Sequence, residues 1–397
     1  MRTRTGAAML CSLGLTACGG GGGGSGGGGD LYPLWVETDV AVADLDGDGR
    51  PDILTLAQYA SSDKAREGRL IVHLQRTPGV FTTVQTAIVG VYPWRMAVAD
   101  IDGDGALDVA VSDVDGDRGA WLLVQDRANR GQFLPAREIA AGFNGYDIAV
   151  ADLNGDTLAD IAVTSSAARL AILYQDPLQP AAFQPAASIT VQGTATTAVT
   201  TGDLDGDGRA DLAMNVIQSA SGGAVNSVTG ISLQQGDGSM GPVTTLAPQQ
   251  GINVTGMTIA DYDGDGFTDV FAYFTPSSTS YRSKMMVLLQ GPVPGAFAAP
   301  ADTSMGDLKG EMDAVFADLD GDQRPDAAVV GFYPSGSPTE VKANLHRFTQ
   351  SGAGAFALVS TTPLSIDASC VTAGDLDGDG LNELVVLADK DRFQVLD

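Results

Sequence analysis

Carboxylates recur at a fixed spacing in seven short stretches of this chain, and the first reads DLDGDGRPD from Asp44 to Asp52. Positions 1, 3 and 5 of the stretch place aspartates on alternate residues of a tight turn, and position 9 adds a fourth carboxylate. With the backbone carbonyl of position 7, these are the hard oxygens that Ca2+ takes at about 2.3 to 2.6 Å, with six to eight ligands. Mg2+ fits less well, because it demands a smaller octahedron and retains its water. The stretch therefore predicts a calcium site.

The seven copies, called the acidic loops below, start at intervals of 56, 52, 51, 58, 57 and 57 residues, which identifies a repeat protein. A single such stretch could be a solvated acidic turn, but seven in register argue for bound cations. We therefore expect up to seven structural Ca2+ ions. The predicted ligands are Asp44, Asp46, Asp48, Arg50, Asp52; Asp100, Asp102, Asp104, Ala106, Asp108; Asp152, Asn154, Asp156, Leu158, Asp160; Asp203, Asp205, Asp207, Arg209, Asp211; Asp261, Asp263, Asp265, Phe267, Asp269; Asp318, Asp320, Asp322, Arg324, Asp326; and Asp375, Asp377, Asp379, Leu381, Glu383.

Three loops depart from the pattern. The third has Asn154 at position 3 and Thr157 where a glycine is expected, so it should be the weakest site. The sixth has Gln323 at that glycine position, and the seventh ends in Glu383. An EF-hand is excluded, because it needs a glutamate at position 12. That position holds Thr55, Val111, Val163, Met214, Ala272, Val329 and Val386.

The elements that position these loops are short strands. An apolar strand runs into each loop and another leaves it, so each loop closes a β-hairpin. A third strand follows, then a turn that ends in a large apolar residue, then a fourth strand. Four antiparallel strands repeated seven times predict an all-β fold, a seven-bladed β-propeller over residues 31–397, with an open solenoid as the alternative. The turn residues are Phe81, Phe133, Phe183, Met240, Phe297 and Phe356.

The seventh repeat is incomplete, since no aromatic turn or fourth strand follows its third strand at 392–396. Residues 31–36 are the candidate for a fourth strand supplied by the N-terminal side. That segment is short and contains Pro33, so a three-stranded seventh blade is the alternative.

The first residues resemble an export signal. Arg2 and Arg4 precede an apolar run that is too short to span a bilayer. It ends in LTAC at Cys18, which resembles the lipobox of bacterial lipoproteins. The resemblance implies a signal peptide over 1–17, a lipid-modified Cys18 and a glycine-rich tether over 18–30. The protein would be lipid-anchored in the cell envelope, at the outer membrane or cell surface. An ordinary signal peptide cut near Ala17 is the alternative.

The net charge of −27 comes from the acidic loops, which hold 27 of the 49 acidic residues and leave 22 against 22 Lys plus Arg. Such a balance argues against a nucleic-acid partner, which would require basic patches. Three cysteines, two of them among the first twenty residues, allow no disulfide framework in the body. We expect Cys370 to be a small buried apolar residue.

The repeated AD-L-DGDG-x-x-D, followed by G-x-F turns such as Gly79 with Phe81, resembles the FG-GAP and VCBS repeat family. That family includes the propeller of integrin α subunits. The resemblance covers residues 31–397 and implies a calcium-stabilised seven-bladed propeller that acts as an extracellular adhesion or ligand-binding module. Every repeat carries a calcium loop here, whereas integrin α has them in only some blades. With no inserted domain, the chain resembles a bacterial relative of the integrin head.

A ligand is expected on the face of the disc opposite the acidic loops, where blade connections and second-to-third-strand loops gather aromatics. Aromatic platforms on a polar surface suit a glycan or a protein partner; the alternative is that they are packing plugs between blades. No oligomer is required. A DVDGD stretch starting at Asp113 resembles a further calcium loop, but it lacks the fourth carboxylate and is interpreted as a polar turn. The candidate ligand-binding residues are Tyr59, Tyr92, Trp94, Tyr146, Tyr281 and Tyr333.

We expect a non-catalytic binding module. His73 and His346, the two histidines of the chain, both fall within predicted third strands, and no G-x-S-x-G, H-E-x-x-H or P-loop pattern occurs. Two other functions stay open. One is a polysaccharide lyase or hydrolase on the same scaffold, and the other is a scaffold for an envelope assembly.

Overall fold

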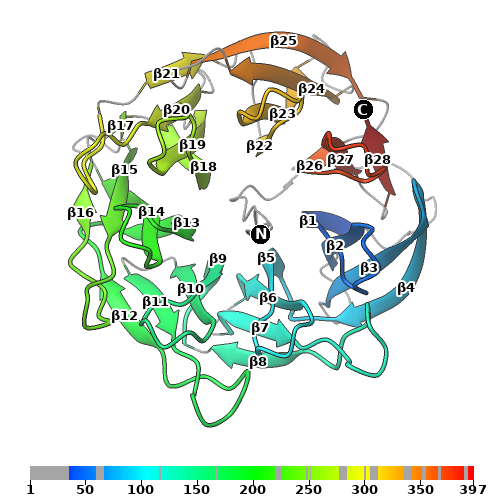
Figure 1. The fold of residues 1–397 in the computed structure, drawn as a ribbon, viewed down its shortest axis with the longest axis horizontal. Helices are drawn as coiled ribbons and strands as arrows, with labels where there is room; N and C mark the ends of the chain where they lie inside the picture. The colour runs from blue at the N-terminus through cyan, green and yellow to red at the C-terminus, as the bar shows by residue number, and fades with distance from the viewer. Residues whose placement is uncertain are drawn as a thin grey trace, which may run out of the picture.

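Seven small antiparallel sheets stand around one axis like the blades of a propeller (Figure 1). This computed structural model describes residues 35–59, 67–115, 118–140, 142–165, 169–219, 225–246, 249–250, 252–276, 284–298, 301–304, 312–334, 341–350, 355–364, 368–388 and 392–397. Within these ranges the chain forms strands and turns, with no helix, and hence none that could cross a membrane. The all-β propeller with seven blades is confirmed.

The first four blades each place their strands from the axis outward in chain order. The first blade has β1 (Trp35–Ala43), β2 (Asp52–Tyr59), β3 (Gly68–Thr77) and β4 (Val80–Ile88). The second has β5 (Pro93–Ala99), β6 (Asp108–Asp113), β7 (Ala120–Leu123) and β8 (Arg137–Ala140). The third has β9 (Gly145–Ala151), β10 (Asp160–Ser165), β11 (Arg169–Leu173) and β12 (Ala187–Thr190). The fourth has β13 (Ala195–Gly202), β14 (Asp211–Ser219), β15 (Val225–Ser232), β16 (Thr244–Thr245) and β17 (Gln249–Gln250), the last two both paired with β15.

The last three blades follow the same plan. The fifth has β18 (Ile252–Ala260), β19 (Asp269–Pro276), β20 (Lys284–Leu288) and β21 (Ala301–Ser304). The sixth has β22 (Met312–Ala317), β23 (Asp326–Pro334), β24 (Val341–Gln350) and β25 (Phe356–Pro363). The seventh has β26 (Ala368–Gly374), β27 (Glu383–Ala388) and β28 (Arg392–Leu396).

The second strand of each blade is buried on both faces, because each sheet packs between two neighbouring blades. In β6 and β10 every residue is buried. This explains why these strands read as continuous Val, Ala, Ile and Leu runs instead of alternating with polar residues. Burial of this apolar surface between blades is the main stabilising term of the ring.

The seventh blade consists of three strands in the described part of the chain, which agrees with the three-stranded alternative; residues 31–34 of the candidate fourth strand lie outside the described residues. Trp35 and Val36 begin β1, the innermost strand of the first blade, so they do not form an outer strand of the seventh. The ring closes instead through side chains. Phe393 on β28 packs edge-on against Phe81 and His73 of the first blade, with ring centroids 5.5 and 5.3 Å apart. Cys370 is buried in the same interface, as expected.

The seven innermost strands surround a cavity of about 830 Å3 along the axis, lined mainly by small residues such as Ala97, Ala149 and Thr200. Five ionisable or polar side chains are buried near those ends of the innermost strands that point away from the acidic loops. We call these five side chains the axial cluster. Arg95, on β5, donates from Nη1 to Asp39 Oδ1 (3.3 Å) and to the Thr38 carbonyl (3.2 Å).

The other members of this axial cluster are Asp147, Asp313 and Tyr273, and the Tyr273 hydroxyl donates to Asp313 Oδ1 at 3.0 Å. A Cβ at Gly256 would lie 2.4 Å from the Tyr273 ring, so the glycine makes room for it. The three aspartates also accept backbone N–H groups from the neighbouring blade, from Met96, Val199 and Val371 respectively for Asp39, Asp147 and Asp313. The axial cluster and these N–H donors therefore involve residues from all seven blades.

Candidate metal centres

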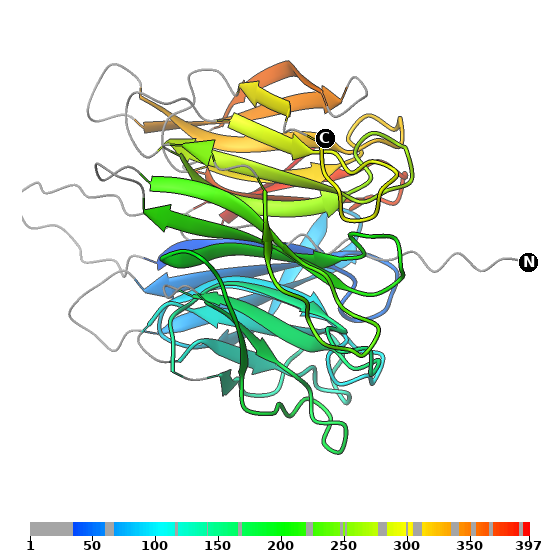
Figure 2. The same cartoon turned by 90° about the vertical axis from the view of Figure 1, so that its left-hand side faces the viewer.

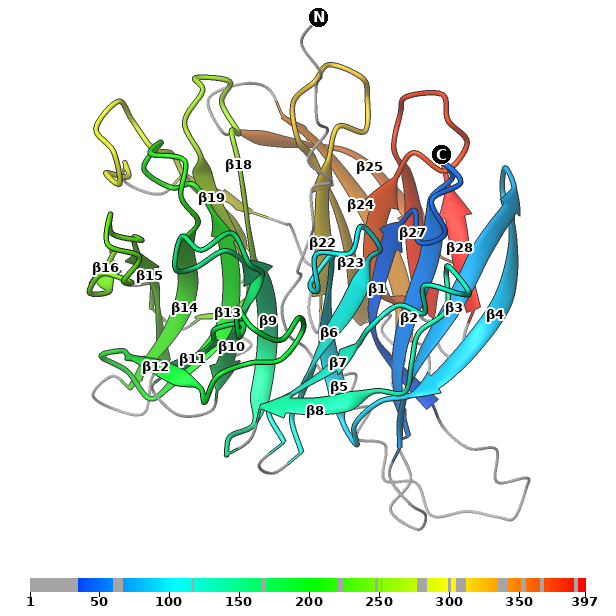
Figure 3. The same ribbon diagram turned by 60° about the horizontal axis from the view of Figure 1, so that its bottom comes forward.

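The seven acidic loops join the first and second strands of their blades and emerge on one side of the disc, the loop face (Figures 2 and 3). The second strands end on the other side, the opposite face, where the described blade connections such as residues 89–92 also lie. The sequence predicted this separation, because strand direction alternates within a blade.

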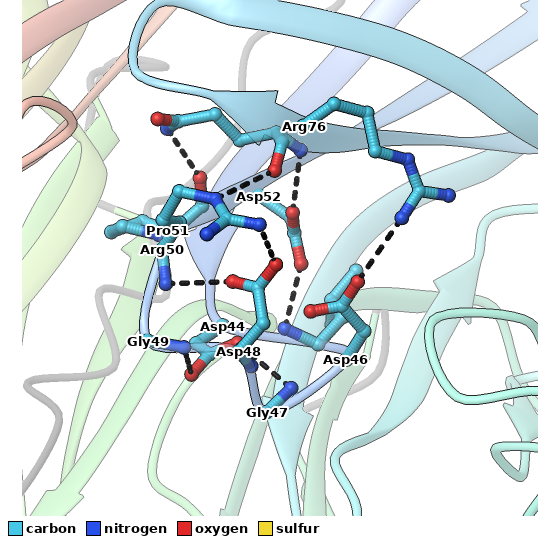
Figure 4. A network of polar contacts seen from close by, with 11 residues as sticks. Asp44, Asp46, Gly47, Asp48, Gly49, Arg50, Pro51, Asp52 and Arg76 are labelled. Carbon is cyan, nitrogen blue, oxygen red and sulfur yellow. Dashed lines mark hydrogen bonds and ion pairs between the residues drawn. The ribbon is translucent and has the colours of Figure 1, made fainter.

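The position-1 carboxylate organises each loop through backbone N–H groups (Figure 4). In the first loop Asp44 Oδ1 accepts from Gly47 (2.9 Å) and Asp48 (3.1 Å), and Oδ2 accepts from Gly49 (2.9 Å). Asp48 in turn accepts from the Arg50 N–H at 2.9 Å. These contacts curl the backbone so that the aspartates of positions 1, 3 and 5 face a common point.

Position 9 fixes the loop to the blade beneath it. Asp52 is fully buried, and its Oδ2 accepts the Leu45 N–H at 2.9 Å. Leu45 at position 2 is 1% exposed, so its side chain anchors the loop in the core. The same bond from position 2 to position 9 recurs in all seven loops, at distances of 2.6 to 3.2 Å.

The second oxygen of position 9 binds a residue that sequence reasoning missed. Asp52 Oδ1 accepts the backbone N–H of Gln75, which directly follows the core of the third strand, at 2.7 Å. A glutamine stands at the equivalent place in the next five blades, and each of these amides donates to position 9 of its own blade. The recurrence was visible in the sequence, because each glutamine stands six to eight residues before a turn residue identified above, such as Gln125 before Phe133.

The turn requires positive φ at positions 4 and 6, and Gly47 and Gly49 supply it with φ of 75° and 86°. Thr157 and Gln323 occupy position 6 of the third and sixth loops at φ of 71° and 68°. These are strained values for residues with a Cβ, and a β-branched threonine tolerates them least. Thr157 therefore takes the glycine conformation at a steric cost, which is consistent with the expectation that the third loop is the weakest site.

The donor set fits a divalent cation that prefers oxygen. In at least five loops, among them those starting at Asp44, Asp100, Asp203, Asp261 and Asp318, three carboxylates offer oxygens within 4.8 Å of one another. Asp46 Oδ1 is a buried carboxylate oxygen without a hydrogen-bond donor. Burial, and next the charge of Asp48, raise the pKa of Asp46. An uncompensated buried carboxylate is costly, and a bound cation would compensate it.

Burial also raises the pKa of the position-9 carboxyls to about 6 in Asp52, Asp108, Asp160, Asp211 and Asp269, against the effect of the backbone N–H donors. Arginines partly compensate the outer carboxylates. Arg50 pairs with Asp48, and Arg209 pairs with Asp207 in the same way. Both guanidinium groups are more than one-third exposed, so these pairs add little stability.

The predicted aromatic residues of the opposite face have different environments. Tyr59, Tyr92 and Tyr146 are half-buried, whereas Trp94 is 5% exposed. Trp94 is therefore a packing residue, and its assignment to a ligand surface is corrected. Tyr281 lies outside the described residues, and Tyr333 is on β23 with no description of its side chain.

Asp113 and the two histidines form hydrogen bonds that give them a structural role. Asp113 accepts four N–H groups, from Val91, Tyr92, Asp115 and the Trp121 ring, at 2.8 to 3.1 Å. It thus fixes the connection between the first two blades, which agrees with a polar turn. The histidines lie on the third strands β3 and β24, and their Nδ1 atoms contact Thr83 and Thr361 at 2.9 and 3.0 Å.

Asp46→Ala is expected to destabilise the protein in Ca2+ more than Asn154→Ala does. The first removes a charged ligand from a complete set, and the second removes a neutral ligand from a strained loop. If Asp46→Ala abolishes one site, the loss is about 2.7 kcal/mol at a Ca2+ concentration 100-fold above Kd. Urea unfolding of both variants with Ca2+ and with EDTA measures the difference. Equal losses, or a loss that persists in EDTA, would contradict this ranking.

Comparisons with known proteins agree with this architecture. The FG-GAP-like repeat family matches residues 44–111 and again residues 100–163. No curated protein matches the chain as a relative. Among solved structures, the chain is similar to the BP39L lectin from Burkholderia pseudomallei, with TM-score 0.52, 14% identity, and 91% and 99% of the two chains covered.

Two enzymes have a similar fold. The periplasmic gluconolactonase PpgL of Pseudomonas aeruginosa gives TM-score 0.52 and 14% identity over 80% of this chain and 84% of its own. The exotype rhamnogalacturonan lyase YesX gives TM-score 0.50 and 13% identity over 96% of this chain and 74% of its own. At such identities the likeness concerns the fold alone. The chain therefore contains FG-GAP-like repeats, matched within residues 44–163, and its ring of seven sheets is a seven-bladed β-propeller.

Proposed function

We propose that this protein is a calcium-stabilised, non-catalytic binding module of the cell surface. Its opposite face would recognise a glycan or a protein, and a lipid on Cys18 would tether it to the envelope. The observation that carries the proposal is the construction of the loops. In all seven loops the position-9 carboxylate accepts the position-2 N–H, and in at least five loops three carboxylates converge within 4.8 Å.

The residues of the first loop that would hold the ion are Asp44, Asp46 and Asp48 with Asp52, together with the Arg50 carbonyl; the other loops would use the equivalent positions. Bound Ca2+ would neutralise the clustered carboxylates and cross-link the two strands that flank each loop. The bound ions would therefore have a structural role. They would stabilise the fold from the loop face, and the opposite face would be available for recognition.

An aromatic stack on the opposite face of the first blade supports a binding role there. The Arg69 guanidinium lies 3.7 Å from the centre of the Trp35 ring, and the Tyr59 ring meets Trp35 edge-on at 5.2 Å. All three side chains are half-buried, so each keeps an exposed part. A rigid, partly exposed aromatic group beside a cation suits a sugar ring or a protein hot spot.

The binding role is tested with the body, residues 31–397, on a glycan array and in a pull-down from solubilised membranes, both in millimolar Ca2+. Tyr59→Ala is expected to weaken binding at least 10-fold, because aromatic anchors carry a large share of interface energy. Leu178→Ala is the matched control, since Leu178 is 87% exposed on a third-to-fourth-strand turn of the loop face.

If Tyr59→Ala and Leu178→Ala weakened binding equally, the opposite face would be excluded as the binding site. Capture of an envelope protein without any glycan would favour the scaffold function. Turnover of a polysaccharide, abolished by one substitution on the opposite face, would favour the enzyme.

A further inference from the structure

Four of the six glutamines at the ends of the third strands make contacts beyond their own blade. Their side chains are 0 to 5% exposed. Within a blade, the amide Nε2 of Gln75, Gln125 and Gln175 donates to the carbonyl of loop position 8 at 2.9 to 3.0 Å. Together with the backbone N–H bond to position 9, this fixes the end of the loop to the third strand.

Four of the glutamine side chains also donate to the acidic loop of the preceding blade. Gln125 Nε2 donates to the Leu45 carbonyl at 3.0 Å, and Gln175 Nε2 donates to the Ile101 carbonyl at 2.8 Å. Gln234 donates to the Asp152 carbonyl at 2.9 Å, and Gln350 donates to the Tyr262 carbonyl. In the seventh blade Asn382 has this role, donating to the Asp318 carbonyl at 2.9 Å.

The accepting carbonyls belong to the residues that carry or flank the predicted ligands. Leu45 stands between Asp44 and Asp46. Its N–H is held by the position-9 carboxylate of its own blade, and its carbonyl is held by the glutamine of the next blade. The two peptide groups on either side of Leu45, which connect the ligands of positions 1 and 3, are thus both held by hydrogen bonds. Groups that orient metal ligands in this way normally contribute strongly to metal affinity.

We infer that Gln125, Gln175, Gln234 and Gln350, with Asn382, are positioning residues that make the Ca2+ affinity of five acidic loops depend on the blade that follows each of them. This inference rests on the calcium function proposed above. Its consequence is that these five metal sites are coupled to their neighbours through the blade interfaces instead of being independent.

Gln290 in the fifth blade provides a natural contrast. Its backbone N–H donates to Asp269 at 2.7 Å, like the others, and its Oε1 accepts the Gly295 N–H at 2.9 Å. Its buried Nε2, however, has no hydrogen-bond acceptor. The loop of the fourth blade, starting at Asp203, is therefore without this contact from its neighbour.

The test measures Ca2+-dependent hydrogen exchange of loop peptides in the full body by mass spectrometry, during a Ca2+ titration. Gln125→Met keeps the volume and removes the amide donor. It is expected to raise the Ca2+ concentration for half-maximal protection of peptide 44–52 about 10-fold. Gln290→Met is the matched control and should leave peptide 203–211 within about 2-fold of the wild type, since no bond between blades is lost. Asn382→Ala should weaken Ca2+ binding by the loop at 318–326 in the same way. This variant replaces Gln125→Met in the test if Gln125→Met does not fold.

A shift confined to the loop that precedes the substituted residue supports the inference. Equal shifts in the loops before Gln125→Met and Gln290→Met, or no shift before Gln125→Met and Asn382→Ala, would overturn it while leaving calcium binding intact. A wild-type body in which Ca2+ protects no loop would overturn the proposed calcium function, and this inference with it.

Discussion

Chelation of divalent cations with EDTA is expected to lower the melting temperature of the body by roughly 20 to 25 °C. Each saturated site contributes about 2.7 kcal/mol at a Ca2+ concentration 100-fold above Kd, so seven sites contribute roughly 19 kcal/mol. With an unfolding entropy of about 2.1 cal/mol/K per residue, this corresponds to that temperature shift for residues 35–397. The total also exceeds the stability of a typical domain, about 5 to 15 kcal/mol, so partial unfolding at room temperature is a further expected result.

Circular dichroism melting with EDTA, and after addition of excess Ca2+ or Mg2+, measures this effect. Ca2+ should restore the wild-type melting temperature and Mg2+ should not, because the loops offer up to five oxygens that suit the larger ion. A melting curve that EDTA leaves unchanged would refute structural calcium. If Mg2+ restored the melting temperature and Ca2+ did not, the assignment of calcium would be refuted.

Arg95→Leu is expected to destabilise the protein by about 3 to 5 kcal/mol, which is the usual cost of removing one partner of a buried ion pair. The substitution leaves Asp39 buried without its cation. It also removes the positive charge that lowers the pKa of Asp147 and of Asp313. Urea unfolding in saturating Ca2+ measures the loss. Arg50→Leu is the matched control, because Arg50 forms an exposed pair worth about 0 to 1 kcal/mol.

The pH dependence distinguishes lost charge from lost packing. Burial raises the pKa of Asp39 to about 7, and Arg95 opposes that rise. A carboxyl with a raised pKa in the folded state stabilises the protein at low pH and loses this contribution as the pH rises through the folded value. Without Arg95 the pKa rises further. The difference between Arg95→Leu and the wild type should therefore be larger at pH 8 than at pH 5. A difference independent of pH would indicate packing alone.

The double variant with Asp39→Asn completes the design. It removes the unpaired charge, so it should recover part of the stability that Arg95→Leu loses at pH 8. No recovery would mean that the Arg95 contact with Asp39 is not what holds the cluster together.

Much of the architecture could be predicted from the chain because the pattern repeats. The acidic loops, their apolar flanks and the turn aromatics recur at nearly constant spacing, and each is a local feature that the residues within nine positions decide. The first acidic loop illustrates this local control through Asp44, Gly47 and Gly49. A short acidic side chain bonds the N–H groups that follow it, and glycine permits the positive φ of the turn.

Contacts between blades could not be read in the same way, because they join residues that are far apart in the chain. Gln125 and Leu45 are 80 residues apart, and Arg95 and Asp39 are 56 apart. Nothing local marks either side chain as a partner of the other. The burial of Trp94 likewise depends on how neighbouring sheets pack, which local hydrophobicity does not specify.

The sequence by itself therefore determined the repeat, the hairpin loops, their oxygen donors and the number of blades, since these follow from local backbone geometry and from the period. The tertiary structure alone decided how the three described strands of the seventh blade close the ring, which charges meet at the axis, and how five of the loops are held by the next blade. Those features arise only when surfaces distant in sequence exclude water together, and buried polar groups must then find whatever partners the fold brings within reach.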